Sequence, residues 1–145
     1  MTNSILILNG PNLNMLGIRE PEIYGADTIH DIEKICKKRA AELGFSVDCY
    51  QSDSEGKLVD LIQESNANHA AIILNAGAYT HTSIAILDAL RSIEIPIIEV
   101  HLSNIFQREN YRHISYVSEA ADGIICGLGS HSYELALEAL VKLIK

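Results

Sequence analysis

The sequence lacks an excess of positive charge. Eleven Lys and Arg stand against 19 Asp and Glu in 145 residues, which gives a formal net charge of -8 at pH 7. Proteins that bind nucleic acids or anionic membrane surfaces usually carry the opposite balance or a basic block. The densest basic run, from Lys34 to Arg39, falls within one expected helix. We therefore expect neither nucleic acid nor a membrane as a partner.

Cysteines are few, and none has the spacing of a metal site or a redox motif. Cys36, Cys49 and Cys126 are odd in number and far apart, which favours free thiols packed as small apolar side chains in a reducing compartment. The six histidines contain no HxxxH pair, so no metal site is expected. The first residues lack the basic segment and apolar run of a signal peptide. Together these absences predict a cytoplasmic protein.

Long apolar runs, linkers, repeats and low-complexity stretches are also missing. A membrane-spanning helix needs about 20 apolar residues, and the composition excludes collagen, coiled-coil and disordered classes. A chain of this length can bury roughly two-thirds of its unfolded surface. We expect one domain over residues 1–145, with a core that needs neither disulfides nor a structural metal.

Short apolar runs alternate with amphipathic segments of helix length. Strands are expected at 5–8, 45–50, 70–74, 96–100 and 123–126, and helices at 28–43, 55–66, 82–93 and 133–145. This alternation predicts an α/β protein with a doubly wound, five-stranded parallel sheet and three α/β/α layers. At this length the flavodoxin-like strand order 2-1-3-4-5 fits best. Ligands of such sheets bind at the carboxyl ends of the strands, near strands 1 and 3.

The connection after the first expected strand is unusually long. It runs to roughly 20 residues, against ~2–6 for most βα loops, and long loops commonly form lids or binding loops. It carries Arg19 and Tyr24 among Gly and Pro residues. A guanidinium beside a phenol favours the phenolate, which would make Tyr24 a base. A solvated loop with Tyr24 packed on its rim is the alternative.

The third expected strand ends in a polar segment, residues 75–83. A Gly-containing turn leads into a helix that starts with hydroxyl residues, and capping by Thr80 or Thr82 would explain those. Capping does not explain Asn75 and His81 at the same strand end. Both are therefore candidates for contact with a ligand.

The fourth expected strand ends with Glu99 and His101. Residues two apart on a strand share a face, so the carboxylate can fix the tautomer of the imidazole; a purely structural histidine is an equal alternative. Three of the five arginines, Arg19, Arg108 and Arg112, follow strands 1 and 4. In an acidic chain, this clustering favours an anionic or polyhydroxylated small ligand.

The sequence lacks signals for nucleotide binding and for Schiff-base chemistry. The segment 127–132 after the last strand lacks the third Gly of a dinucleotide fingerprint, and there is no P-loop. Every lysine falls in a helix, near a helix start or at the C-terminus, so no Schiff base is expected inside the sheet.

Five segments, taken together and in this order, resemble the type II dehydroquinase (3-dehydroquinate dehydratase) family. They are Gly10-Pro-Asn-Leu-Asn-Met-Leu-Gly-x-Arg-Glu-Pro-x-x-Tyr-Gly25, Gln51-Ser-x-x-Glu-Gly56, Asn75-x-Gly-Ala-Tyr-Thr-His-Thr-Ser83, Glu99-Val-His-Leu-Ser-Asn104 and Arg108-Glu-x-x-Arg-His113. The resemblance implies a hydro-lyase that removes water from 3-dehydroquinate by anti elimination through an enolate, giving 3-dehydroshikimate.

The resemblance also implies catalytic roles. Tyr24 is the base that takes the proton beside the ketone, and Arg19 holds it as tyrosinate. Asn12 positions a water that stabilises the enolate oxygen. His101, oriented by Glu99, protonates the departing hydroxyl.

Substrate-binding roles are implied for a second set of residues. Asn75, His81 and Arg112 bind ring hydroxyls, while the Leu102 amide and Ser103 hold the carboxylate. Asp88 reaches into a neighbouring subunit's site, and Arg108 supports the lid. The family assembly is a homododecamer built from trimers, with no cofactor and no metal.

Two positions depart from the family pattern. Ala76 stands where many members have Pro, and Leu87 where an Arg often precedes the acidic residue. The second departure bears on the subunit contact and neither on the chemistry.

Two alternatives remain open: a flavodoxin-like small-molecule-binding or signalling domain without catalysis, and a non-catalytic scaffold. The sequence leaves open whether the step serves aromatic amino acid biosynthesis through the shikimate pathway or quinate breakdown.

Overall fold

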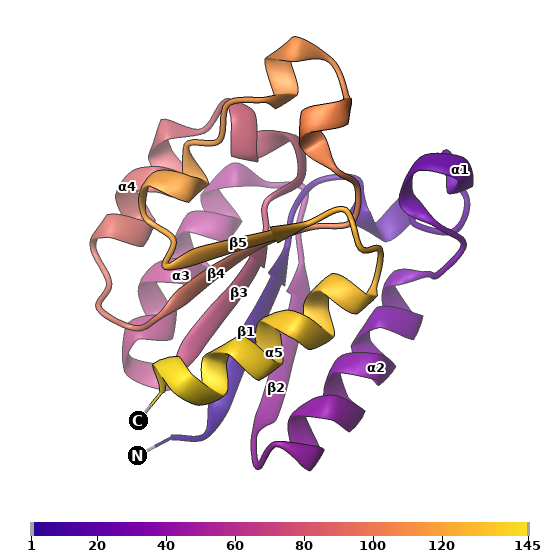
Figure 1. The fold of residues 1–145 in the computed structure, drawn as a ribbon. Helices are drawn as coiled ribbons and strands as arrows, with labels where there is room; N and C mark the ends of the chain where they lie inside the picture. The colour runs from indigo at the N-terminus through magenta and orange to yellow at the C-terminus, as the bar shows by residue number, and fades with distance from the viewer. Residues whose placement is uncertain (1, 145) are drawn as a thin grey trace.

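A five-stranded parallel sheet forms the centre of the molecule in a computed structural model that describes residues 2–144. The strands are β1 (Ser4–Asn9), β2 (Ser46–Gln51), β3 (Ala71–Asn75), β4 (Ile97–His101) and β5 (Gly123–Cys126), in the order β2-β1-β3-β4-β5. Helices α2 (Ile29–Glu42) and α5 (His131–Leu143) cover one face, and α3 (Glu55–Asn68) and α4 (Ile84–Arg91) cover the other (Figure 1). The predicted flavodoxin-like order and three layers are confirmed.

The continuous apolar run of β1 follows from this layering. Ile5 and Ile7 belong to the core under α2 and α5, whereas Leu6 and Leu8 belong to the core under α3 and α4. All four are at most 1% exposed. A strand covered on both faces has no solvent side, so it shows no alternation of polar and apolar residues.

Two helix starts are capped by hydroxyl side chains. Thr28 accepts a hydrogen bond from the Asp31 backbone N–H, and the Asp31 carboxylate accepts one from the Thr28 N–H, which makes a capping box for α2. Ser54 caps α3 through the Lys57 N–H. Gly44 follows α2 with a φ of 87°, as a helix-ending glycine should.

The predicted start of the helix at 82–93 is wrong. Residues Gly77–His81 form a 3-10 turn, η2, and α4 begins only at Ile84. Ser83 is the N-cap, because its extended backbone lets Oγ accept from the Ile86 N–H at 3.0 Å. Neither Thr80 nor Thr82 caps this helix; Thr80 is buried in the preceding turn.

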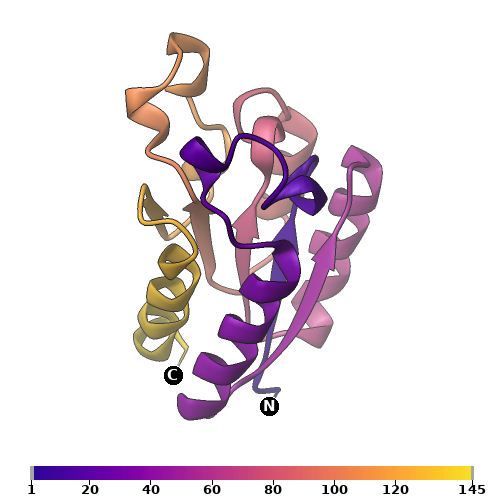
Figure 2. The same ribbon diagram turned by 90° about the vertical axis from the view of Figure 1, so that its right-hand side faces the viewer.

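Two long connections stand over the carboxyl end of the sheet (Figure 2). The one after β1 contains a 3-10 turn, η1 (Leu13–Met15), and a short helix, α1 (Pro21–Tyr24). The one after β4 contains three 3-10 turns, η3 (Ile105–Gln107), η4 (Asn110–Arg112) and η5 (Val117–Glu119). None of the described helices has the length and apolar character needed to cross a membrane.

Candidate active site

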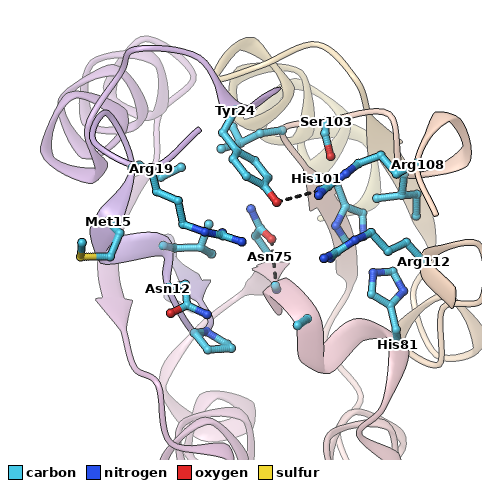
Figure 3. Close-up of a pocket in the computed structure, with 17 residues that line it drawn as sticks. Asn12, Met15, Arg19, Tyr24, Asn75, His81, His101, Ser103, Arg108 and Arg112 are labelled. Carbon is cyan, nitrogen blue, oxygen red and sulfur yellow. Dashed lines mark hydrogen bonds between the residues drawn. The ribbon is translucent and has the colours of Figure 1, made fainter. Parts of the chain in front are cut away.

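A pocket opens at the carboxyl end of the sheet, between these two connections and the turn after β3 (Figure 3). Ten of the twelve residues singled out in the sequence line it: Asn12, Arg19, Tyr24, Asn75, His81, His101, Leu102, Ser103, Arg108 and Arg112. Of the other two, Glu99 lies buried behind His101, and Asp88 is exposed on α4. The fold thus gathers residues that are up to 100 positions apart in the sequence.

Positive charge surrounds the phenol of Tyr24. Nη1 of Arg108 donates a hydrogen bond to Tyr24 Oη at 2.7 Å. The guanidinium carbons of Arg19 and Arg108 lie 5.3 and 5.1 Å from the centre of the ring, within the range of cation–π attraction. The sequence pairs Arg19 with Tyr24, but the direct hydrogen bond to the oxygen comes from Arg108.

His101 and Glu99 form a buried pair at the end of β4. Nε2 of His101 donates to Glu99 Oε2 at 2.5 Å, and the Glu99 side chain is 0% exposed. Two hydroxyls also donate hydrogen bonds to the Glu99 carboxylate: Ser115 Oγ donates to Oε2 at 2.8 Å, and Ser118 Oγ donates to Oε1. Burial acts to raise the pKa of Glu99, but the hydrogen bonds and charge of His101, with the two serine hydroxyls, hold the pKa below its ordinary value.

An ionised Glu99 fixes how the imidazole of His101 is used. Since Nε2–H points to the carboxylate, Nδ1 is the nitrogen left for other partners. The negative charge also lies where positive charge develops when the ring takes up a proton. Ser115 and Ser118 were not singled out in the sequence, because their contact with Glu99 depends on the path of the long connection.

His81 lies beside His101 on the pocket wall. Their ring centres are 6.4 Å apart and nearly parallel, and His81 Nδ1 lies 2.7 Å from the Ile114 carbonyl oxygen, to which it donates. Burial lowers the pKa of His81, and the nearby charges of His101 and Arg112 lower it further, against the opposing effect of the Ile114 hydrogen bond. The His81 ring is therefore neutral at pH 7, with its one N–H, on Nδ1, donated to the Ile114 carbonyl.

The loop that carries Asn12 is held by the segment after β2. Asn12 has a positive φ of 67°, a conformation that Asn tolerates better than most residues. Its backbone N–H donates to Asp53 Oδ1 at 3.0 Å, and Gln51 Nε2 donates both to that oxygen and to the Gly10 carbonyl at 3.1 Å. The Gln51 motif noted in the sequence therefore supports the Asn12 loop, and Asp53, which was not singled out, contacts it directly.

Gly10 allows this loop to approach the turn after β3. A Cβ at position 10 would lie 2.4 Å from the carbonyl oxygen of Ala76. The Gly10 N–H also donates to the Asn75 carbonyl at 2.8 Å. Only glycine permits so close a contact between the two backbones.

Three arginines give the pocket a positive wall. Arg112 is oriented by Glu109, whose Oε2 accepts from Nε at 2.9 Å, and it lies with Arg19 and Arg108 among the lining residues. Ser103 is partly exposed beside them. This wall suits the anionic or polyhydroxylated ligand expected from the sequence.

In residues 2–144, no group of three or more His, Cys, Asp or Glu is arranged to hold a metal ion.

The sheet order and the position of the pocket define a flavodoxin-like α/β protein whose polar site lies at the switch point between β1 and β3. Comparison with known proteins narrows this class. The chain belongs to the class II dehydroquinase family, whose sequence model matches residues 3–141.

Named relatives and solved structures agree with that family. A 3-dehydroquinate dehydratase of Rhizobium etli is 55% identical over 140 residues, covering 97% of each chain. A 3-dehydroquinate dehydratase 1 of Agrobacterium fabrum is equally similar, at 55% over 97% of each chain. The type II dehydroquinase from Propionibacterium acnes superposes with a TM-score of 0.93 at 44% identity, over 98% of both chains.

Proposed function

We propose that this protein is a hydro-lyase that removes water from 3-dehydroquinate to give 3-dehydroshikimate, the type II dehydroquinase reaction. Relatives named 3-dehydroquinate dehydratase match this chain over nearly the whole length of both proteins. One observation carries the proposal: a phenol hydrogen-bonded to a guanidinium and an imidazole hydrogen-bonded to a buried carboxylate line the same pocket. Elimination of water beside a ketone needs one group to take a proton and another to give one.

Tyr24 is the base in this proposal. Its phenolate oxygen removes the proton from the carbon beside the ketone, and the C–H electron pair forms the enolate. Arg108 and Arg19 supply the positive charge that stabilises the phenolate, supported by the 2.7 Å hydrogen bond from Arg108 and the position of Arg19 over the ring. Arg108 thus acts on the base itself as well as supporting the lid.

Asn12 holds a water molecule that donates to the enolate oxygen. This is an oxyanion-hole role, which needs a donor fixed before charge develops. The hydrogen bond between the Asn12 backbone and Asp53 supports it, because it fixes the loop that carries the amide.

His101 is the acid. In the acting form its imidazole carries a proton on both nitrogens. It gives the Nδ1 proton to the hydroxyl that departs from the carbon next to the deprotonated one, while Nε2–H remains hydrogen-bonded to the Glu99 carboxylate. The enolate collapses to the ketone, the new C=C bond forms, and the C–O bond breaks with release of water. Tyr24 is left protonated and His101 neutral, so one proton must pass from the base to the acid before the next turnover.

The remaining residues bind the substrate. Asn75, His81 and Arg112 contact ring hydroxyls, and the Leu102 amide with Ser103 holds the carboxylate. Their presence around one pocket supports this assignment. Because the three lining arginines are cations, the site favours a substrate with a negative charge.

The assembly is proposed as a homododecamer of trimers in which Asp88 completes a neighbouring subunit's site. The exposed position of Asp88, outside the pocket of its own chain, is compatible with that role. A cytoplasmic location stays a prediction, supported by the three free cysteines. The step can serve either aromatic biosynthesis or quinate breakdown.

The assay follows the absorbance of the conjugated enone as purified protein acts on 3-dehydroquinate in the presence of a chelator. Steady formation of the enone is expected, and Tyr24→Phe is expected to abolish turnover while substrate still binds. Folded protein that binds the substrate without producing enone would overturn the activity and favour a binding domain. Near-normal turnover by Tyr24→Phe would remove Tyr24 as the base but leave the activity intact.

A further inference from the structure

A chain of hydrogen bonds beneath the pocket joins three side chains from three elements. Asn75, at the end of β3, donates through Nδ2 to the phenol oxygen of Tyr133 at 3.0 Å. Tyr133, in the first turn of α5, donates to Oδ1 of Asn9, at the end of β1, at 2.5 Å. All three are at most 3% exposed, and Tyr133 is 0% exposed. None of the roles above uses the phenol of Tyr133.

The direction of every bond in this chain is set by one backbone group. The Gly77 N–H can only donate, and it does so to Oδ1 of Asn75 at 3.2 Å. The Asn75 amide must therefore turn Nδ2 toward Tyr133, whose oxygen accepts and whose single proton goes to Asn9. One N–H of Nδ2 is then used on Tyr133, and the second is available to a ligand in the pocket that Asn75 lines (Figure 3).

The buried phenol stays protonated. Burial raises the pKa of Tyr133 far above its ordinary value, and the hydrogen bond from Asn75 offsets only part of that rise. A hydroxyl that never ionises keeps the same donor and acceptor at every working pH. This is suited to holding a neighbour in place.

We infer that Tyr133 is a positioning residue that locks the Asn75 amide in one orientation, so that the pocket receives an N–H donor aimed at an oxygen of the substrate. The inference rests on the proposed role of Asn75 in binding a ring hydroxyl. Without the phenol oxygen, the amide loses the partner that holds Nδ2, and the longer bond from the Gly77 N–H, at 3.2 Å, is left to restrain rotation about its last side-chain bond. Tyr133 itself does not touch the substrate.

The test is Tyr133→Phe, which keeps the ring and removes the hydroxyl. We expect KM for 3-dehydroquinate to rise about tenfold, the size of one lost hydrogen bond, with kcat within about twofold, because the contact is equal in the ground and transition states. In an Asn75→Ala background, Tyr133→Phe should change KM no further. The non-additivity separates action through Asn75 from general loosening of the fold.

Ser65→Ala is the matched control. Ser65 is also buried and donates to the Ile62 carbonyl at 2.5 Å within α3, on the opposite face of the sheet. It should lower the thermal midpoint and leave KM unchanged. All variants are compared at a temperature at which circular dichroism shows them folded.

Three results would overturn the inference. The first is a wild-type KM in Tyr133→Phe while Asn75→Ala raises KM, and the second is an equal effect of Tyr133→Phe in both backgrounds. A wild-type KM in Asn75→Ala itself would remove the proposed role of Asn75 and the inference with it. If Tyr133→Phe does not fold, Asn9→Ala is the second variant. It removes the acceptor of the Tyr133 proton, so the hydroxyl can donate to the Asn75 amide instead and disturb its orientation. The same rise in KM is expected, and its absence counts against the inference.

Discussion

Arg108 donates a hydrogen bond of 2.7 Å to the phenol oxygen of Tyr24, although the two residues are 84 positions apart. The bond links the connection after β1 to the connection after β4 across the mouth of the pocket. Arg19, only five residues from Tyr24 in the chain, lies over the ring and pairs with Glu20 at 3.5 Å. The two cations therefore act on the phenol from different directions.

This difference predicts unequal effects of the two arginines. Arg108→Met removes a donor to the reacting oxygen and should lower kcat by roughly 10²–10³, the usual cost of losing a fixed donor to developing charge. Arg19→Met leaves that bond in place and should cost about tenfold or less, since a half-exposed charge is screened by water. Steady-state kinetics of the two variants checks the order, and a larger loss for Arg19→Met would make Arg19 the principal partner.

The buried carboxylate of Glu99 predicts a pH-dependent contribution to stability. Its pKa in the folded protein lies below the ordinary value of 4.5, so the unfolded state binds more protons as the pH falls. The contribution is complete above pH 4.5 and is lost as the pH falls through the lowered pKa. Compared with Glu99→Gln, wild type should be more stable by roughly 2 kcal/mol at pH 7, since hydrogen bonds to a charged group are strong.

Urea unfolding of both proteins between pH 7 and pH 3 measures this difference. Glu119→Gln changes an exposed carboxylate that pairs with the exposed Arg91, and it serves as the control, with little change expected. A difference between wild type and Glu99→Gln that stays constant down to pH 3 would contradict the assignment.

His81 should titrate at a lower pH than an ordinary histidine. Burial, then the charges of His101 and Arg112, lower its pKa from 6.5, so His81 contributes stability that is present above pH 6.5 and lost as the pH falls through the lowered pKa. An NMR titration should place the midpoint of its ring signal below 6.5. Arg112→Met removes one of the charges and should move that midpoint upward; a midpoint at or above 6.5 in wild type would show that the burial argument is wrong.

Two glycines should respond to alanine in opposite ways. Gly10→Ala puts a Cβ 2.4 Å from the Ala76 carbonyl oxygen, and moving two backbones apart should cost more than about 2 kcal/mol of stability. Gly56→Ala, in the first turn of α3, meets nothing nearer than Ser54 Oγ at 3.9 Å and should gain up to about 1 kcal/mol from helix propensity. Thermal unfolding compares them, and a neutral Gly10→Ala would mean that the two loops are not in fixed contact.

The sheet could be predicted because its determinants are local. The apolar runs of β1 and β3 reflect burial on both faces, and the alternation of β2, whose burial changes at every residue, reflects its place at an edge. The caps Thr28 and Ser54 act within three residues of their own position. The start of α4 was missed because Thr80, Thr82 and Ser83 are all capable caps, and only backbone geometry chooses among them.

The pocket was predictable where a residue sits at a strand end, as Asn75, Glu99 and His101 do. The partners of those residues were not, because Ser115, Ser118 and Tyr133 reach them from distant segments through contacts that no local pattern encodes. Arg108 is a similar case: its bond to Tyr24 exists only because two connections meet in space.

The connection after β1 is attached unevenly. Leu13 and Leu16 are packed in the core, at 8% and 5% exposed, whereas residues 18–23 are exposed. His101, by contrast, sits on a strand with its carboxylate partner sealed beneath it. An outward swing of residues 18–24 would thus remove the Tyr24 phenol and the Arg19 guanidinium together and break the hydrogen bond from Arg108. The imidazole of His101 and its carboxylate partner would stay on their strand, so product could leave on the side of the base without disturbing the acid.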